Sequence, residues 1–293
     1  MVQKRKGPWC DSMKTTLKRL DNVWKEAAVI EFDDNSKFVI MSDCHRGIAN
    51  WGDNFAPNQH LFFAALKDYY RNGYAYIELG DGDELWENRR AEQILRAHSD
   101  AFWLMSEFYK KGRFLMIYGN HDKCKMKRNF AEKNMKDYFP DLQIMEGVRL
   151  RYVCNGKELF LAHGHQGDLL NDTFWWLGRF LVRYVWRPLE LFGVHDPTDA
   201  GKSYEKANRV ERKLEKWVEK RGTSLVTGHT HRSRLSEELP GYFNSGSCVH
   251  PRCITALEIA NGEVLLVKWA VYVTTDNSLK VAREILAGPV KLV

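Results

Sequence analysis

Short apolar runs alternate with longer amphipathic stretches in the first half of the chain. Residues 38–41, 74–79 and 114–118 are brief and rich in β-branched or aromatic side chains, as expected of buried strands. Between them, residues 58–71 and 91–111 repeat apolar side chains at helical spacing. This alternation predicts βαβ organisation with parallel strands.

Strands dominate the second half. From residue 142 onward short apolar runs cluster, and later runs occupy residues 225–227, 242–244, 254–259 and 264–271. The charged segment 204–221 has the pattern of a surface helix. Two sheets packed face to face, with helices outside, fit both halves of the chain. We therefore predict an α/β fold, a four-layer α/β/β/α sandwich of two mixed β-sheets with outer helices and a helical cap insertion.

A chain of 293 residues can bury a full core and holds one large domain, or one domain with an insertion. We expect a basic N-terminal extension at 1–36 and a main domain at 37–271. The cap insertion is placed at about 170–222, and the remaining 272–293 is expected to be a C-terminal tail.

Five polar segments follow strand-like runs. They are Asp43-Cys44-His45, Gly80-Asp81, Gly119-Asn120-His121-Asp122, His163-Gly164 and Gly228-His229-Thr230-His231. Any one of them occurs often by chance, but five in order, each after a predicted strand, favour a common site. The carboxyl ends of strands are where open α/β sheets place their ligands.

The donor types in these segments indicate metal binding. Carboxylate, carboxamide and imidazole together suit divalent ions such as Mn²⁺, Zn²⁺ or Fe²⁺. Because residues two apart on an extended chain point the same way, Asp43 and His45 can hold one ion. His229 and His231 have the same spacing after a glycine, and we expect them to serve different ions. The pattern predicts a site for two metal ions.

This order of segments resembles the five-block signature of the calcineurin-like metallophosphoesterases, namely D-x-H, G-D-x-x-D/E, G-N-H-D/E, a His-Gly block and G-H-x-H. The resemblance covers residues 37 to about 267 and includes Asn244-Ser245-Gly246-Ser247, which is similar to the Asn-x-Gly-Ser turn of the family. It implies one ion held by Asp43, His45 and His231, a second ion held by Asn120, His163 and His229, and Asp81 as the bridge between them.

The resemblance also implies a reaction, the hydrolysis of a phosphate ester or pyrophosphate bond by a hydroxide that two ions activate. His121 would be a non-ligand acid that protonates the leaving oxygen, and Asp122 would fix its tautomer. A structural histidine is the alternative for His121. We expect two divalent ions, Mn²⁺ first, with Fe²⁺, Zn²⁺ or Mg²⁺ as alternatives.

Two of the blocks are doubled. Gly80-Asp81-Gly82-Asp83 offers two registers, and we favour Asp81 because it directly follows the apolar run and places Glu84 at the second acidic position of the family. Asp83 stays open. In His163-Gly164-His165 we take His163 as the ligand, since it lies closer to the strand 158–162, and His165 as a substrate contact or outer partner.

Basic side chains near the blocks suggest phosphate contacts. The net charge of +6 agrees with an anionic partner. Lys123 and Lys125 follow His121-Asp122 directly, and we expect them to overhang the site and steer phosphates into it; a solvated loop is the alternative. Arg46, next to His45, is expected to clamp a phosphate.

The segment 174–192 combines tryptophans with arginines spaced by four residues: Trp175, Trp176, Trp186, Arg179, Arg183 and Arg187. It is too short and too charged to cross a bilayer, and Pro188 would interrupt it. We predict a cap helix beside the site, whose apolar side meets acyl chains or a membrane surface while Arg179 and Arg183 bind phosphates. A helix buried against the sheets is the alternative.

Within the family, residues 80–86 and this aromatic segment look most like the UDP-2,3-diacylglucosamine hydrolase-like group, which cleaves a pyrophosphate in a lipid-linked nucleotide sugar. Many members of that group carry Arg where this chain has His121. We expect a phosphorylated small-molecule or lipid-linked substrate. The alternatives are a nuclease or phosphodiesterase, a protein phosphatase, and a non-catalytic metal-binding scaffold. Nucleic acid is the less expected partner because no nucleic-acid module is found.

Six cysteines are scattered without framework spacing, and no cleavable signal peptide is evident. We therefore expect a cytoplasmic protein that is peripheral at the inner membrane surface through residues 174–192.

Overall fold

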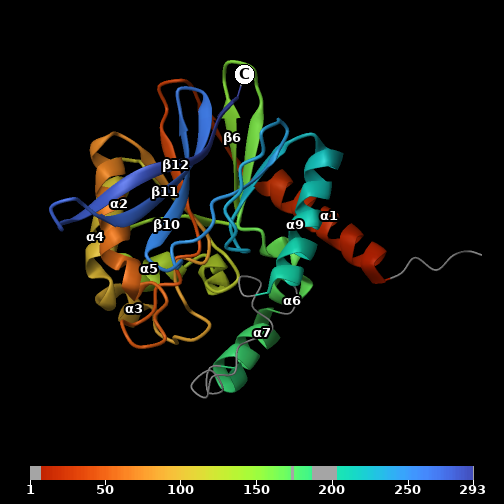
Figure 1. Cartoon of the computed structure of the whole chain (residues 1–293). Helices are drawn as coiled ribbons and strands as arrows, with labels where there is room; N and C mark the ends of the chain where they lie inside the picture. The colour runs from red at the N-terminus through yellow and green to blue at the C-terminus, as the bar shows by residue number, and fades with distance from the viewer. Residues whose placement is uncertain (1–7, 173–174, 187–202, 293) are drawn as a thin grey trace, which may run out of the picture.

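Two mixed β-sheets form the centre of the protein, in a computed structural model that describes residues 8–172, 175–186 and 203–292 (Figure 1). The five-stranded sheet has the order β1 (Ala28–Phe32), β6 (Gly147–Tyr152), β7 (Glu158–Ala162), β8 (Ser224–Thr227) and β9 (Tyr242–Asn244). The seven-stranded sheet has the order β12 (Leu279–Lys291), β11 (Glu263–Val273), β10 (Cys253–Ala260), β2 (Phe38–Met41), β3 (Ala75–Leu79), β4 (Phe114–Ile117) and β5 (Ile144–Met145). Each sheet contains parallel and antiparallel pairs.

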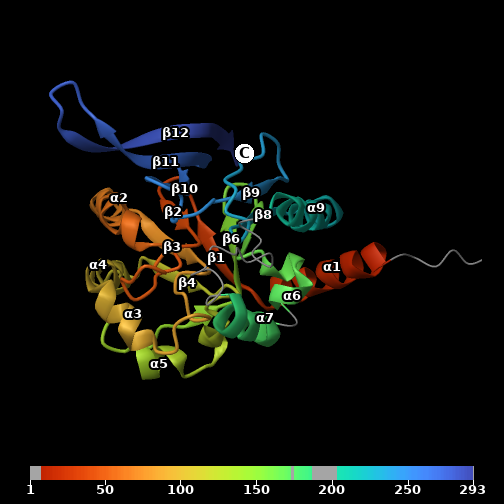
Figure 2. The same cartoon turned by 60° about the horizontal axis from the view of Figure 1, so that its bottom comes forward.

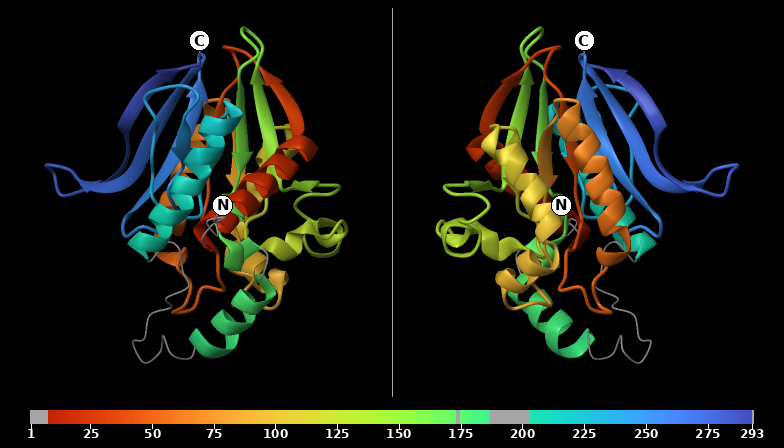
Figure 3. Two further views of the ribbon diagram at one scale, coloured as in Figure 1. Left: turned by 90° about the vertical axis from the view of Figure 1, so that its right-hand side faces the viewer. Right: turned by 90° about the vertical axis from the view of Figure 1, so that its left-hand side faces the viewer.

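Helices cover the outer face of each sheet. On the seven-stranded sheet lie α2 (Gln59–Arg71) and α4 (Ser99–Lys110), with α3 (Ala91–Ala97) and α5 (Phe130–Asn134) beside them (Figure 2). On the five-stranded sheet α1 (Pro8–Glu26) and α9 (Tyr204–Arg221) lie side by side (Figure 3). Along the chain, the short helices α6 (Leu169–Asp172) and α7 (Trp175–Leu181) come between β7 and α9, and a π-helical turn (Val182–Trp186) continues α7.

Three apolar clusters separate these layers. Ile40, Leu79 and Leu161 belong to the cluster between the two sheets. A second cluster joins the seven-stranded sheet to the α2 and α4 side chains, and a third joins the five-stranded sheet to α1 and α9. Burial of these side chains on both faces of each sheet is the main stabilising contribution. The predicted α/β/β/α sandwich of two mixed sheets is confirmed.

The division of the chain into domain and tails needs correction at both ends. In the N-terminal region, β1 pairs in parallel with β6, and Leu20 and Val23 of α1 are buried against the five-stranded sheet. At the other end, β12 pairs with β11 from Val273 back to Glu263. Most β12 side chains are exposed, so the strand has little apolar alternation and is held chiefly by backbone hydrogen bonds. Residues 1–36 and 272–293 therefore contain integral elements of both sheets.

Two predicted helices differ in detail. The helix expected at 91–111 is divided at His98, whose backbone is not helical and whose buried imidazole bonds Asp53 and Gln59. The segment 174–192 contains α7 and the π-helical turn, which lie at one end of the protein in Figure 1. Its remaining residues, Arg187 and Pro188 among them, lie outside the described residues. In the described part of the chain, every helix is either too short or too polar to span a membrane.

Candidate metal centre

The five polar segments meet because their strands end at a common edge. In the seven-stranded sheet β2, β3 and β4 run parallel, and in the five-stranded sheet β7 and β8 do so. Backbone bonds then tie neighbouring loops together: Asp43 N–H donates to Gly80 O (3.1 Å), and Gly228 N–H donates to His163 O (3.0 Å). A Cβ at Gly228 would overlap Ser42 and Asp43, so only glycine permits this approach.

One donor group lies on the β2 and β8 loops. His231 Nε2 lies 3.2 Å from Asp43 Oδ1 and 3.2 Å from His45 Nε2. Asp43 is fully buried, and its second oxygen accepts the His229 backbone N–H at 3.0 Å. Burial opposes the ionisation of Asp43, but the imidazoles of His231 and His163 outweigh it and lower its pKa to about 2. This group offers one carboxylate and two imidazoles to a single cation.

A second donor group adjoins the first. His163 Nε2 lies 3.0 Å from Asp81 Oδ2 and 3.9 Å from Asp43 Oδ1, and the His163 and His229 rings are 5.2 Å apart. Burial alone would lower the pKa of His163, but Asp81 and Asp43 raise it to about 9. The two carboxylates therefore create a potential that favours positive charge between the groups.

The buried donors fit divalent cations. Among the described residues, four predicted ligands keep a buried atom that makes no well-aligned hydrogen bond, although two of the four lie in close ion contacts: Asp43 Oδ1, Asn120 Oδ1, His163 Nε2 and His229 Nε2. A buried polar atom left without a partner costs about 1–3 kcal/mol. These are also the oxygen and imidazole nitrogen atoms that Mn²⁺, Fe²⁺ and Zn²⁺ accept as ligands. Cations bound here would satisfy all four atoms at once.

Backbone strain is concentrated at the same residues. Five of the seven predicted ligands have a left-handed backbone, with φ between 47° and 67°: Asp43, His45, Asp81, His229 and His231. Residues other than glycine seldom adopt this conformation, at a cost of the order of 1–3 kcal/mol each, and such strain clusters at functional sites. The strained loops aim the side chains inward from the ends of the strands.

Outer partners set the imidazole tautomers. His163 Nδ1 bonds the Leu79 carbonyl at 2.9 Å, and His45 Nδ1 bonds Glu84 Oε2 at 3.0 Å. Each bond assigns the proton to Nδ1 and leaves the Nε2 lone pair available to a metal ion, the usual arrangement around protein metals. Glu84 is buried; burial opposes its ionisation, but His121 and His45 outweigh that effect and lower its pKa to about 2.

His121 lies beside the donor groups. Its Nδ1 is 2.9 Å from Glu84 Oε1, its ring stacks on Trp86 with centroids 4.3 Å apart, and its backbone N–H donates to Asp81 Oδ1 at 2.7 Å. The sequence assigned the orienting carboxylate to Asp122, whereas the structure places Glu84 there. The sequence pattern marks Glu84 only as the second acidic position of the family motif, and spacing alone does not show that it reaches His121.

A family model described as calcineurin-like phosphoesterase matches residues 36–233, which is more than half of the chain. The chain belongs to this family. No curated protein sequence matches it. Among solved structures, a cold-active protein-tyrosine phosphatase from a psychrophilic Shewanella species shares 14% identity at a TM-score of 0.41, covering 89% of this chain and 83% of its own. Vps29 of Chaetomium thermophilum shares 9% at a TM-score of 0.38, covering 85% and 96%. Neither likeness is strong enough to bear on function.

A buried ionic cluster lies beneath the donor groups and includes residues for which the sequence predicts catalytic or substrate-binding roles. Asp122 accepts from Gly119 N–H at 2.7 Å and pairs with Lys125 Nζ at 2.7 Å. Burial comes first among the causes that raise the pKa of Asp122. Through its bond to the Gly119 backbone, Asp122 braces the loop that carries Asn120. Asp83, the other register of the doubled block, pairs with Lys125 and Arg46, away from the donor groups.

Arg46 and Lys125 are corrected from substrate contacts to structural cations. The Arg46 guanidinium is fully buried, donates to both oxygens of Glu78 at 2.8 Å and reaches Asp83 Oδ1 at 2.8 Å. Lys125 Nζ is equally inaccessible. Since both side chains are buried and paired with carboxylates below the site, neither can reach a phosphate. Residue spacing alone gives no sign of this inward orientation.

Lys123 and His165 lie in a neighbouring polar cluster. Lys123 Nζ is buried against the carbonyl and Oδ1 of Asp172, both at 2.8 Å. His165 Nε2 is 3.6 Å from Asp172 Oδ1. Glu146, His165 and Asp172 form a separate group of donors here, and Arg19 of α1 pairs with both of its carboxylates. Burial and then Lys123 lower the pKa of His165 well below its usual range. Lys123 thus does not overhang the site as a solvated, phosphate-steering side chain.

The cap segment contacts the loop after β3. Arg183 donates from Nε to Trp86 O (2.8 Å) and from Nη2 to Leu85 O (3.1 Å), so it ties the π-helical turn to the Trp86 loop. Arg179, one turn earlier, is half-buried and faces Cys124 across a cavity. Of the two cap arginines expected to bind phosphates, Arg183 is engaged by carbonyls, while Arg179 faces open space.

Proposed function

We propose that this calcineurin-like protein is a dinuclear-metal-dependent phosphoesterase that hydrolyses a phosphate ester or pyrophosphate bond. The observation that carries the proposal is the pair of adjoining donor groups, Asp43–His45–His231 and Asp81–His163–His229, with Asn120 beside the second. Four of these side chains keep a buried ligand atom without a hydrogen bond among the described residues. A metal-binding scaffold without catalysis would need these ligands too, but it would not need His121, the proposed acid, beside them.

Each side chain has a role in this proposal. Asp43, His45 and His231 would hold one ion, Asn120, His163 and His229 would hold the other, and Asp81 would serve both. When bound, two divalent ions supply a water of lowered pKa and neutralise the phosphoryl oxygens. The outer bonds of Glu84 and of the Leu79 carbonyl keep the imidazole nitrogens aimed at the ions.

His121 is proposed as the group that delivers a proton to the leaving oxygen. Glu84 engages Nδ1, so the exchangeable position is Nε2. Stacking on Trp86 fixes the plane of the ring, and the backbone bond to Asp81 places the imidazole beside the second donor group. A positioned acid of this kind contributes about 10²- to 10⁴-fold to turnover.

The cap supports an amphiphilic or nucleotide-linked substrate, as in the UDP-2,3-diacylglucosamine hydrolase-like group. Trp176, Phe180 and Tyr184 are each more than half exposed along α7 and the π-helical turn. Exposed aromatic side chains beside a phosphoesterase site can contact an acyl chain or a membrane surface. The preference for Mn²⁺, the cytoplasmic location and the contact with the inner membrane surface remain predictions.

The test compares three substrates, p-nitrophenyl phosphate, bis-p-nitrophenyl phosphate and a UDP-linked pyrophosphate, with Mn²⁺ and with chelator. The proposal predicts turnover that requires Mn²⁺, and the preferred substrate identifies the type of bond. Turnover that persists in chelator would contradict it. Absence of turnover on all three substrates, with metal bound, would shift weight to the scaffold alternative.

A further inference from the structure

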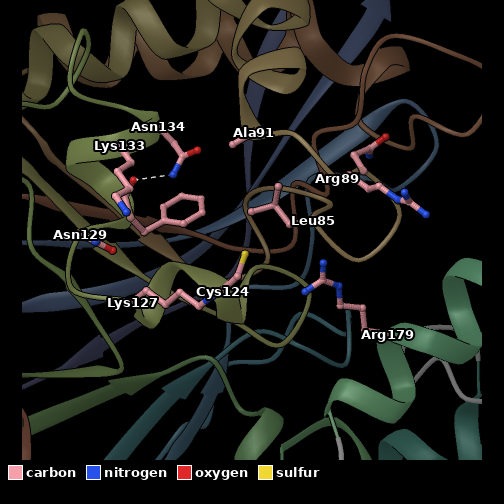
Figure 4. Close-up of a pocket in the computed structure, with 11 residues that line it drawn as sticks. Leu85, Arg89, Ala91, Cys124, Lys127, Asn129, Lys133, Asn134 and Arg179 are labelled. Carbon is pink, nitrogen blue, oxygen red and sulfur yellow. Dashed lines mark hydrogen bonds between the residues drawn. The ribbon is translucent and has the colours of Figure 1, made fainter.

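A cavity of about 310 Å³ lies between the cap helix α7, the loop after β3 and α5. Four cationic side chains line it, Arg89, Lys127, Lys133 and Arg179, and none of the lining residues in the described part of the chain is a carboxylate. Leu85 and Phe130 contribute apolar surface to its wall. Figure 4 shows Arg179 extending from the cap toward Cys124 and Leu85.

The cations of this cavity differ in their partners from the cations buried beneath the metal centre. Arg46, Lys123 and Lys125 are each paired with buried carboxylates. By contrast, within the described residues Lys127, Lys133 and Arg179 have no ion pair. Arg89 donates to the neutral Tyr184 hydroxyl (2.8 Å). Like charges that share a cavity repel one another, so an anion with more than one charge would relieve the repulsion.

The cations also affect one another. The pKa of Arg183, beside the cavity, is lowered first by burial and then by the positive charges of Arg179 and Arg89. The cap segment and the loop after β3 therefore place Arg89, Arg179 and Arg183 close to one another. Bringing like charges together in this way opposes folding slightly and does not stabilise it.

Two residues that line the cavity are close in sequence to residues of the candidate metal centre. Leu85 directly follows Glu84, the carboxylate that orients His45 and His121. Cys124 is two residues from Asp122, a separation of at most about 7 Å between Cα atoms. The loops that line the cavity therefore also carry residues of the metal centre.

We propose that this cavity binds a phosphoryl group, as a second anionic subsite beside the metal centre. Arg179 supplies a planar guanidinium fork that matches phosphoryl oxygens, and Lys127 and Lys133 supply point charges. The bound group is either the second phosphoryl group of the substrate, which rests on the proposed function, or part of a separate phosphorylated effector.

The binding test uses the full-length chain in chelator, so that neither bound metal nor turnover enters the result. Calorimetry with inorganic pyrophosphate is compared for the wild type, Lys127→Gln/Lys133→Gln, the charge-conserving Lys127→Arg/Lys133→Arg, and the control Lys111→Gln/Lys136→Gln, whose lysines are exposed outside the cavity. We expect the Gln pair in the cavity to weaken binding by about tenfold, since each exposed charge contributes a fraction of a kcal/mol. The Arg pair and the control should match the wild type.

Failure of the wild type to bind pyrophosphate, or equal binding by both Gln pairs, would overturn the subsite. If binding weakens as expected, kinetics with Mn²⁺ identifies the source of the phosphoryl group. A fall in the ratio of kcat/KM for the UDP-linked pyrophosphate to that for bis-p-nitrophenyl phosphate assigns it to the substrate, and an unchanged ratio assigns it to an effector. Because binding is measured in chelator, the subsite stands even if the proposed phosphoesterase function fails.

Discussion

Trp86 stacks on His121, with ring centroids 4.3 Å apart and 23° between the ring planes. The same tryptophan is buried, and its carbonyl accepts the Arg183 Nε–H at 2.8 Å. A chain of contacts therefore runs from the cap segment through Trp86 to the proposed acid. It links the position of the cap segment to that of the His121 ring.

Replacing Trp86 by leucine is expected to reduce kcat by about tenfold or more, because a small displacement of a catalytic group is costly. Metal content should stay at the wild-type level, since no predicted ligand is removed. Trp103→Leu is the control, because that side chain is 52% exposed. Metal analysis beside steady-state kinetics checks this, and equal kcat for both variants would count against the role given to Trp86.

Glu84→Gln tests the shared carboxylate. Glu84 bonds His45 at 3.0 Å and His121 at 2.9 Å. Its loss should reduce metal affinity or turnover by about 10- to 100-fold, as for other outer partners of metal-ligating histidines. Asp122→Asn is the comparison that separates our two assignments. If Asp122→Asn changed the pH profile of kcat while Glu84→Gln did not, the original assignment of Asp122 as the orienting group would be restored.

Arg46→Met should destabilise the protein strongly. The substitution leaves Glu78 and Asp83 buried without their guanidinium partner, and breaking a buried pair costs about 3–5 kcal/mol. Arg96→Met removes an exposed i,i+4 pair with Glu92 and should cost no more than about 1 kcal/mol. Urea unfolding of both variants measures the difference. Equal midpoints would show that the Arg46 cluster is not structural.

The buried carboxyl of Asp53 should make the free energy of unfolding depend on pH in the acid range. Burial opposes its ionisation, but hydrogen bonds from His98 and from the Ala49 backbone outweigh burial and lower its pKa. A carboxyl with a depressed native pKa stabilises the fold fully above its unfolded value of about 3.9, and this contribution disappears as the pH falls below that value. The stability difference between the wild type and Asp53→Asn should therefore shrink from pH 5 to pH 2. Urea titrations at several pH values test this, with the exposed Asp137→Asn as control; a constant difference would contradict the assignment.

The sequence carried enough information for the sandwich and for the position of the donor groups, since strand ends and ligand types are local properties. It did not show that Arg46 and Lys125 turn inward, because Glu78, Asp83 and Asp122 meet them only through the parallel pairing of the strands. For the same reason Glu84, not Asp122, holds His121. The sequence pattern does not predict the strand β12, because backbone pairing with β11, not side-chain burial, holds it in place.

Metal stoichiometry measured together with turnover, for the wild type and for Asp81→Ala, tests the central claim most directly. The account predicts about two divalent ions per wild-type chain and turnover that chelator abolishes. Asp81→Ala should lose both, because the proposed bridge serves both ions, while the exposed Asp137→Ala control keeps them. Wild-type metal content and turnover in Asp81→Ala would contradict the dinuclear site.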